Sequence, residues 1–201
     1  MSEQKKLSLM FRVLRGLGFN YSEEAYGQVS LWGVVKRVHK TYRDSFLLNC
    51  IMNSWLLSPF LPRKVRPWVL KRIGCRVGKG CFIGDNVRID AGHSDMITIE
   101  DGVSIAGGTR LLCHQRDFRH YYVGSDYMKL GYTIKPIVLK QGCLIGMESF
   151  VLPGVTVGEG AIVGAGSLVT KDIPAWTVAT GRPAKVVKQI PNREVNESVD
   201  I

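Results

Sequence analysis

An aliphatic residue returns at every sixth position of the segment 137–169, and this period limits the possible folds more than any other feature. An α-helix repeats its apolar face about every 3.6 residues and a half-buried strand every second residue, so neither produces it. A sustained period of six instead predicts short strands joined by turns and stacked as a solenoid. The residues in phase are Leu139, Ile145, Val151, Val157, Val163 and Val169.

A second set of small or apolar residues precedes the first set by two positions. Alternate residues of a strand share a face, so both sets are expected to point inward. Glycine, which accepts the dihedral angles of a tight corner, follows three of the aliphatic residues. Three units would make one triangular coil of about eighteen residues, and stacked coils would pair as parallel strands. The second set comprises Ile137, Cys143, Ser149, Val155, Ala161 and Ser167.

The same period starts earlier in the chain and is interrupted twice, over 91–96 and over 115–136. A solenoid accepts an insertion only at a corner, where the added residues can leave the stack without breaking its hydrogen bonds. We therefore expect the loop 115–136 to project outward. It is rich in polar and aromatic residues, and loops of this length are usually functional or disordered. The earlier residues in phase are Val77, Ile83, Ile89, Ile99, Ile105 and Leu111.

The formal net charge of +10 belongs to the N-terminal part of the chain. Residues 1–79 carry fifteen Lys and Arg against four Asp and Glu, whereas the remainder carries twelve against thirteen. A basic cluster at 63–72 could meet phosphates, lipid headgroups or solvent. Because the sequence contains no recognised nucleic-acid motif, we expect no nucleic-acid partner.

Two helices are expected before the repeats begin. Apolar residues from Leu7 to Leu17 fall at helical spacing beside basic ones, and a second helical region runs from about Leu31 to Leu57, where Pro59, Pro62 and Pro67 end it. Such helices either pack on the protein itself or make a peripheral contact with an anionic membrane. The apolar run 46–57 is too short for a membrane span, which needs about 20 residues.

Five cysteines, an odd number, together with the absence of an apolar leader, favour a reduced, cytoplasmic protein. Cys75 and Cys81 stand six positions apart and could be mistaken for metal ligands. They precede Val77 and Ile83 by two positions, so they fit the small inward positions of two successive units better.

The C-terminal half contains an ordered string of motifs: Ile145-Gly146-Met147, Leu152-Pro153-Gly154-Val155, Val163-Gly164-Ala165-Gly166-Ser167, Val169-Thr170-Lys171-Asp172-Ile173-Pro174 and Gly181-Arg182-Pro183-Ala184-Lys185. This string resembles the hexapeptide-repeat acyltransferases. The resemblance is closest to the maltose and galactoside O-acetyltransferases and to bacterial surface-polysaccharide O-acetyltransferases, and it covers about residues 72–190.

The resemblance implies an all-β fold, a left-handed parallel β-helix with an N-terminal α-helical segment and a protruding loop. The handedness comes from the resemblance alone, since a period fixes no hand. The expected division is a basic helical segment at 1–71, the β-helix at 72–190 with its loop at 115–136, and a polar tail at 191–201.

The resemblance also implies a homotrimer that binds acetyl-CoA between neighbouring subunits and uses a histidine as general base. His114 matches that histidine, and an imidazole titrates near neutral pH, as a general base should. The acetyl group would pass directly to the acceptor in a ternary complex. A covalent route through Cys113 is an alternative, although a pleated strand would turn that thiol inward.

The motif positions assign residues to the donor, and no metal is expected. Met147 and Ala165 match residues that line the pantetheine groove, and Thr170 and Lys171 match the nucleotide end. Lys185 matches the residue facing the 3′-phosphate, with Arg182 and Lys188 beside it. Two positions depart from the family pattern: Leu144 replaces a common tryptophan, and Glu148 replaces a small residue without an assignable role.

Asp90, His93 and Asp117 are the candidates for contact with the acceptor, and a carboxylate among them could hold a sugar hydroxyl or orient His114. The expected function is transfer of acetyl to a sugar hydroxyl in capsule, exopolysaccharide or lipopolysaccharide synthesis. Three alternatives remain: a serine, antibiotic or amino-sugar acceptor; a β-helical scaffold without catalysis; and a zinc enzyme of the carbonic anhydrase type. The last would use His93, His114 and His120, whose spacing does not match that family.

Overall fold

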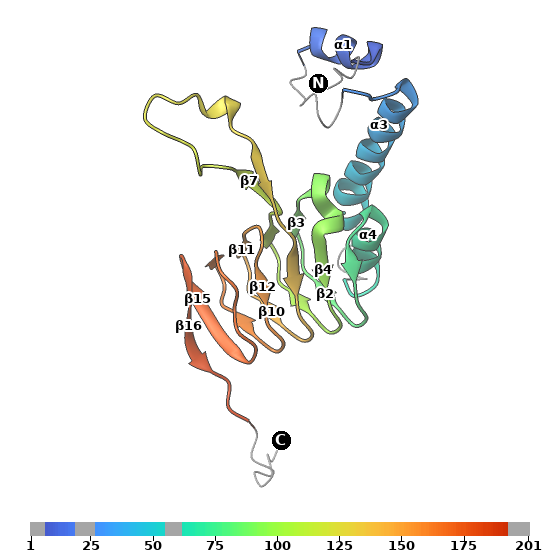
Figure 1. Ribbon diagram of the computed structural model, residues 1–201. Helices are drawn as coiled ribbons and strands as arrows, with labels where there is room; N and C mark the ends of the chain where they lie inside the picture. Colours follow the sequence, from blue (N-terminus) through green and yellow to red (C-terminus); the bar gives the residue numbers. More distant parts are fainter. Residues whose placement is uncertain (1–6, 19–26, 55–61, 193–201) are drawn as a thin grey trace. The chain divides into compact units, whose positions relative to one another are not determined.

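The computed structural model describes residues 7–18, 27–54 and 62–192, and it divides into two compact units, Met1–Phe46 and Leu47–Ile201. Figure 1 shows the order of the elements along the chain. The expected domain boundary at residue 71 stays a prediction.

The first unit contains both expected helices, α1 (Leu9–Gly16) and α3 (Leu31–Phe46). Ser8 caps α1, because its hydroxyl oxygen accepts a hydrogen bond from the backbone N–H of Phe11 at 3.2 Å. The same hydroxyl donates to the carbonyl of Val29 at 2.8 Å, which ties the start of α1 to the segment before α3. Among the described residues no helix has the length and apolar character needed to cross a membrane.

The second unit begins with the π-helix η1 (Leu47–Met52), followed by α4 (Val65–Ile73). The expectation that Pro67 ends a helix is wrong, because Pro67 lies in the first turn of α4, where proline is tolerated. Pro59 and Leu57 lie outside the described residues. Gly74, with a φ of 122°, ends α4 and turns the chain into the first coil.

Arg66 corrects the interpretation of residues 63–72 as a basic surface cluster, since its side chain is buried. Its guanidinium donates to the carbonyl oxygens of Met52 at 3.2 Å and Ile83 at 2.9 Å, and it forms an ion pair with Asp85. A guanidinium can supply several donors in a fixed geometry, which suits this position between η1 and the first coil. Arg66 therefore helps to join the helical start of this unit to the stacked strands.

Three sheets follow, parallel except for the final strand β16, and the chain visits sheets A, B and C in the same order on every turn. Partners lie eighteen positions apart where no residues are inserted, as Leu144 with Ile162 and Phe150 with Leu168. Figure 1 shows the strands stacked in successive layers. This arrangement agrees with the expected three-sided coil, whose handedness stays a prediction. Sheet A contains β1 (Arg76–Val77), β4 (Ile97–Ile99), β9 (Ile137–Leu139) and β12 (Thr156–Val157); sheet B contains β2 (Phe82–Ile83), β5 (Ser104–Ile105), β10 (Leu144–Ile145), β13 (Ile162–Val163), β15 (Thr177–Gly181) and β16 (Ala184–Gln189); sheet C contains β3 (Arg88–Ile89), β6 (Arg110–Leu111), β11 (Phe150–Val151) and β14 (Leu168–Val169).

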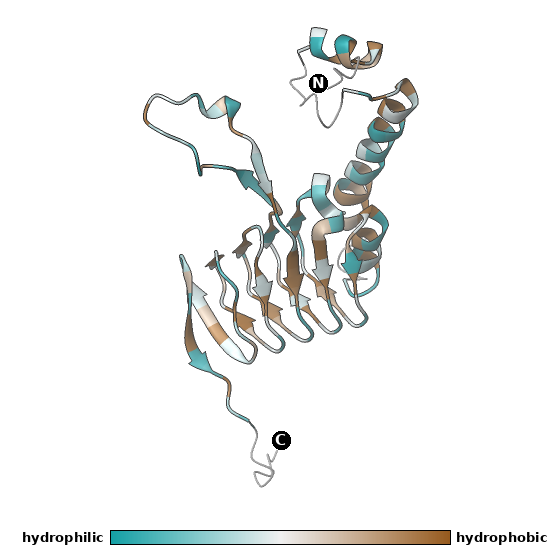
Figure 2. Ribbon diagram, in the orientation of Figure 1, coloured by the Kyte–Doolittle hydropathy of each residue, from teal (hydrophilic) through white to brown (hydrophobic). Residues whose placement is uncertain are grey.

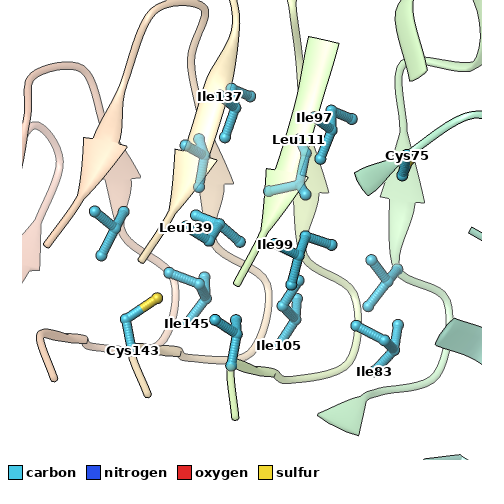
Figure 3. Close-up of a cluster of buried hydrophobic side chains, with 14 of the residues drawn as sticks. Cys75, Ile83, Ile97, Ile99, Ile105, Leu111, Ile137, Leu139, Cys143 and Ile145 are labelled. Carbon is cyan, nitrogen blue, oxygen red and sulfur yellow. The ribbon is translucent and has the colours of Figure 1, made fainter. Parts of the chain in front are cut away.

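The interior of the stack consists of the two sequence sets that repeat every six positions. All twelve residues of the two sets between 137 and 169 are buried, which confirms the predicted inward faces. Figure 3 shows several of them pointing into one continuous core, and Figure 2 shows apolar residues concentrated in the strands. Cys75, Cys81, Cys113 and Cys143 are also buried there, as small apolar side chains. Burying one aliphatic side chain contributes about 1.5–3 kcal/mol, so the ladder is a principal source of stability.

The corner between sheets B and C requires a left-handed backbone conformation at its third residue in every coil. That residue is Asn86 (φ 53°), Gly108 (φ 73°), Glu148 (φ 55°) and Gly166 (φ 67°). Glycine and asparagine accept this conformation readily, whereas glutamate does so at a cost. The departure of Glu148 from the family pattern is therefore also a departure from the local backbone preference.

Both interruptions of the period occur where the chain leaves sheet C for sheet A. The first forms the short 3₁₀ segment η2 (Ala91–Met96). The second forms an antiparallel arm, β7 (His114–Arg116) with β8 (Tyr132–Ile134), whose connection includes η3 (Tyr127–Lys129). Figure 1 shows this arm projecting from the stack, as the sequence predicted. The two insertions bring non-repeat residues together at one corner.

Candidate active site

Asp90 and His114 meet at the corner between sheets C and A. Asp90 follows β3 and His114 begins β7, three residues after the neighbouring strand β6 of the same sheet. The Asp90 N–H donates to the carbonyl of Leu111 at 3.0 Å, so the two coils are locked in register here. Oδ2 of Asp90 hydrogen-bonds to Nδ1 of His114 and also accepts from the Cys113 N–H at 3.3 Å.

The carboxyl group of Asp90 is ionised at neutral pH. Burial raises its pKa, but the hydrogen bond with His114 and the nearby His93 together outweigh burial, so the pKa of Asp90 lies below its ordinary value. An ionised carboxylate only accepts hydrogen bonds, so Nδ1 of a neutral His114 must carry the proton. The other nitrogen, Nε2, then has a free lone pair.

His93 approaches Asp90 from the other side. It lies in η2 with non-helical angles (φ −132°, ψ 34°), and its Nδ1 is 3.3 Å from Oδ1 of Asp90. That distance allows an electrostatic contact, although the ring is not oriented for a hydrogen bond. The ring centroids of His93 and His114 are 5.2 Å apart. One buried carboxylate thus faces two imidazoles, each through its own oxygen.

The arm forms one wall beside His114. The ring of Tyr132 meets the ring of His114 edge to face, with centroids 5.4 Å apart. Arg116 lies over Tyr132 at 4.3 Å and donates to the carbonyl of Leu130 at 2.6 Å, which holds both strands of the arm together. Beyond this base, the arm exposes a group of large apolar and aromatic side chains: Phe118, Tyr121, Tyr122, Val123, Tyr127 and Met128.

Asp117 lies farther along the arm, and its carboxylate is paired with Arg119 rather than with the histidines. Arg119 donates to both carboxylate oxygens, and these hydrogen bonds hold the pKa of Asp117 well below its ordinary value. The structure therefore brings Asp90 and His93 to His114 and places Asp117 in a separate ion pair.

Cys113 precedes His114 but points into the core, where it is buried. Burial raises the pKa of its thiol to about 12, with the negative charge of Asp90 as a second cause. The thiolate is the nucleophilic form of cysteine, so this thiol is not activated at neutral pH. This geometry does not suit the covalent route.

Four of the residues expected at the donor lie on two edges of the stack. Met147 and Ala165 occupy the corner between sheets B and C on adjacent coils, where the Gly166 N–H donates to the Met147 carbonyl at 2.7 Å. Thr170 and Lys171 follow β14 at the corner between sheets C and A, the edge that also carries His114. All four residues are exposed.

Lys185 and Lys188 lie on β16, the edge strand of sheet B, and both are exposed. Lys185 pairs with Thr180 and Lys188 with Val178, and the register shifts between these pairs. Opposed residues of an antiparallel pair share a face, so the shift places both lysines on one face although they are three positions apart. Arg182, in the turn before β16, stacks over Phe150 at 5.7 Å.

A hollow of about 400 Å³ lies elsewhere, against sheet A and its corner with sheet B. It contains none of the residues expected to act in catalysis or donor binding. Its lining residues are Arg76, Val77, Gly78, Ile99, Glu100, Asp101 and Gln141. The candidate site around His114 is instead an open edge bounded on one side by the arm.

Residues 136–171 match the family described as bacterial transferase hexapeptide (six repeats). This segment of the chain is therefore similar to the hexapeptide repeats of bacterial transferases. A Staphylococcus aureus protein named "putative acetyltransferase" is 38% identical to it over 125 residues, 62% of this chain and 60% of that relative. The chain spans between 45% and 60% of the length of the first curated relatives that it matches.

Solved structures share the fold of this chain. A maltose O-acetyltransferase from Clostridium difficile superposes with a TM-score of 0.58 at 23% identity, over 81% of this chain and 90% of that one. A galactoside acetyltransferase in complex with coenzyme A gives 0.55 at 22% identity, over 83% and 86% of the respective chains. The expected resemblance to hexapeptide-repeat acyltransferases is thereby confirmed.

Proposed function

We propose that this protein is an acetyl-CoA-dependent O-acetyltransferase of the hexapeptide-repeat family with His114 as its general base. The observation that carries the proposal is the hydrogen bond between the buried Asp90 carboxylate and Nδ1 of His114. It holds the ring in the tautomer whose Nε2 can accept a proton, and it stabilises the imidazolium that forms. The His114 side chain is 40% exposed, which leaves the ring accessible to an acceptor.

The transfer requires one proton to move twice. Nε2 of His114 removes the proton of the acceptor hydroxyl while the oxygen attacks the thioester carbonyl carbon. Backbone N–H groups in the groove between subunits stabilise the resulting oxyanion. When the tetrahedral intermediate collapses, the C–S bond breaks and the His114 imidazolium returns its proton to the CoA sulfur. Asp90 stays ionised throughout and acts as a positioning residue.

The exposed donor residues support a CoA site. Met147 and Ala165 offer an exposed corner for the pantetheine arm, and Thr170 and Lys171 would meet the nucleotide. Lys185 and Lys188 share one face of β16, so they can approach the same anionic group, and Arg182 lies in the adjoining turn. Phosphate oxygens favour such charged donors. The galactoside acetyltransferase of similar fold was solved with coenzyme A bound.

A homotrimer of left-handed β-helices would explain why the residues proposed for the pantetheine arm and the proposed base lie on different edges of one chain. Met147 and Ala165 occupy the corner between sheets B and C, whereas His114 occupies the corner between sheets C and A. Packing neighbouring copies side by side can place one edge of each kind across a shared groove. The site of one protomer is then completed by its neighbour, as in the acyltransferases that this chain resembles.

The proposed acceptor is a sugar hydroxyl in the synthesis of capsule, exopolysaccharide or lipopolysaccharide. Exposed aromatic faces on the arm, such as Tyr127 and Tyr132, suit the apolar faces of sugar rings. His93 lies beside the base, where it can contact the acceptor as well as Asp90. A serine, antibiotic or amino-sugar acceptor is the second candidate, because the resemblance to acetyltransferases alone does not specify the acceptor.

A cytoplasmic location with a peripheral membrane contact would suit the synthesis of surface glycans. Within the first unit, Leu9, Val13 and Leu17 are exposed at helical spacing, and Arg12 and Arg15 are exposed on the same helix. Basic helices with an exposed apolar face favour anionic bilayers.

Acetyl-CoA turnover tests this function. CoA release would be followed by chromatography with a panel of free sugars, lipid-linked oligosaccharides, serine and aminated antibiotics. Release that depends on a sugar supports the proposal, release only with an amine or serine selects the second candidate, and no binding of CoA contradicts the function. Acetyl-dephospho-CoA serves as a matched donor: loss of the 3′-phosphate should raise the KM for the donor in the parent but much less in Lys185→Gln.

A further inference from the structure

The corner that carries the proposed base also gathers three metal-ligating side chains. One ligand atom each from Asp90, His93 and His114 lies within 4.8 Å of the other two. Nδ1 of His93 and Oδ1 of Asp90, at 3.3 Å, are already separated as in a metal site. Two ligand atoms of a tetrahedral zinc ion with bonds of about 2.1 Å are roughly 3.4 Å apart.

A second observation points to a ligand at the same place. Nδ1 of His93 is buried, and within the described part of the chain it makes no hydrogen bond. A buried polar atom that makes no hydrogen bond costs free energy, so Nδ1 of His93 calls for an explanation although the charge of Asp90 lies nearby. It faces the carboxylate of Asp90, whose other oxygen binds His114.

We propose that Asp90, His93 and His114 form an inhibitory site for a divalent transition-metal ion, with Zn²⁺ as the ion that fits best. Two imidazole nitrogens and one carboxylate are a common donor set for zinc, and a water can supply the fourth ligand. Mg²⁺ prefers oxygen ligands in octahedral geometry, so it fits poorly. One ligand atom of each side chain already lies within 4.8 Å of the other two, so binding requires these atoms to move until they are about 3.4 Å apart.

The bound ion would inactivate the base by changing its tautomer. Asp90 alone keeps the proton of neutral His114 on Nδ1 and leaves the lone pair on Nε2. A metal ion on Nδ1 needs that lone pair, so the proton moves through solvent to Nε2. Nε2 can then no longer accept the proton of a hydroxyl. This consequence rests on the proposed role of His114, whereas metal binding itself does not.

Direct binding tests the site without any assay of catalysis. The protein would be freed of metal with EDTA, dialysed and titrated with Co²⁺ by visible absorption and with Zn²⁺ by calorimetry. We expect one ion per chain and a Kd at least about tenfold higher in Asp90→Asn and in His93→Gln. His120→Asn on the arm and Cys50→Ser, which removes an exposed thiol, are matched controls that should bind like the parent.

Two results would overturn the proposal. One is the absence of saturable binding below millimolar Zn²⁺, and the other is equal binding by the parent and by both folded ligand variants, as judged by circular dichroism. Once the panel has identified an acceptor, Zn²⁺ should abolish acceptor-dependent CoA release and EDTA should restore it. Mg²⁺ should have no effect on this release. Metal binding without any turnover would leave the site standing and contradict the proposed function instead.

Discussion

Asp90 and His114 are 24 positions apart in the sequence and are joined by a hydrogen bond across successive coils. The contact exists because the strands that precede them, β3 and β6, pair in register, with Ile89 opposite Leu111. The repeat therefore supplies a rigid frame, and the residues that leave the repeat at this corner supply the chemistry. The orientation of the base is a property of the stack rather than of the arm.

Asp90→Asn should lower kcat by at least roughly tenfold while the KM for acetyl-CoA changes little. An asparagine can donate its amide N–H to Nδ1, which favours the tautomer with the proton on Nε2. Steady-state kinetics at saturating acceptor would measure this. The matched control is Asp117→Asn, because Asp117 is paired with Arg119 instead of His114, and its kcat should stay within about threefold of the parent. Equal losses of kcat in both variants would contradict a specific role for Asp90.

The stabilising effect of Asp90 should depend on pH in a defined direction. Burial raises the pKa of Asp90, but its contacts with His114 and His93 lower the pKa by a larger amount. The folded-state pKa therefore lies below the unfolded value of about 3.9. Such a group stabilises the fold above the unfolded pKa and loses this effect as the pH falls through the folded pKa. The difference in unfolding free energy between the parent and Asp90→Asn should therefore shrink from pH 5 to pH 3. Urea titrations at several pH values would show it, and a difference that grows on acidification would refute the assignment.

Glu148→Gly should raise the unfolding free energy by about 0.5–1 kcal/mol, whereas Glu148→Ala should not. Glu148 adopts a left-handed conformation (φ 55°) at a corner where two of the other coils have glycine. That conformation costs a residue with a Cβ atom roughly 1–2 kcal/mol, and the greater freedom of glycine in the unfolded chain offsets part of the gain. Chemical denaturation of the three proteins measures the difference. Equal stability of the glycine and alanine variants would mean that the backbone is not the source of the cost.

Iodoacetamide should modify Cys50 in the native protein and spare Cys113. Cys50 is exposed, whereas Cys113 is buried with a thiol whose pKa is raised to about 12. Mass spectrometry of peptides, with and without urea, would locate the modified residues. Cys113→Ala should retain turnover within about tenfold, as expected for a core residue rather than a nucleophile. A variant that folds but loses all turnover would restore the covalent route.

The sequence period was sufficient to predict the core, because each residue in phase from 137 to 169 is buried. It also predicted where the arm leaves the stack. It did not predict the burial of Arg66, since a basic residue near a proline is typical of a surface, and its carbonyl partners come from two distant segments. The pairing of β15 with β16 was missed as well, because the segment 184–189 lies outside the period of six and has no repeat signal of its own.

At the site, the sequence identified Asp90, His93 and His114 as candidates, with His114 as the base, but it left the roles of Asp90 and His93 open. Asp90 was a candidate for acceptor contact or for orienting the base, and its hydrogen bond with His114 favours the second role. Two signals for this contact were present in the sequence. Asp90 follows Ile89 directly and His114 stands three residues after Leu111, and these two aliphatic residues occupy equivalent positions of successive coils.

The most direct test of the central claim is the kcat of His114→Ala with saturating acetyl-CoA and the best acceptor of the panel. Loss of the general base should lower kcat by at least about a hundredfold, while CoA binding measured by calorimetry stays within about threefold of the parent. Equal turnover by parent and variant, with CoA bound tightly by both, would contradict the assignment of His114 as the base.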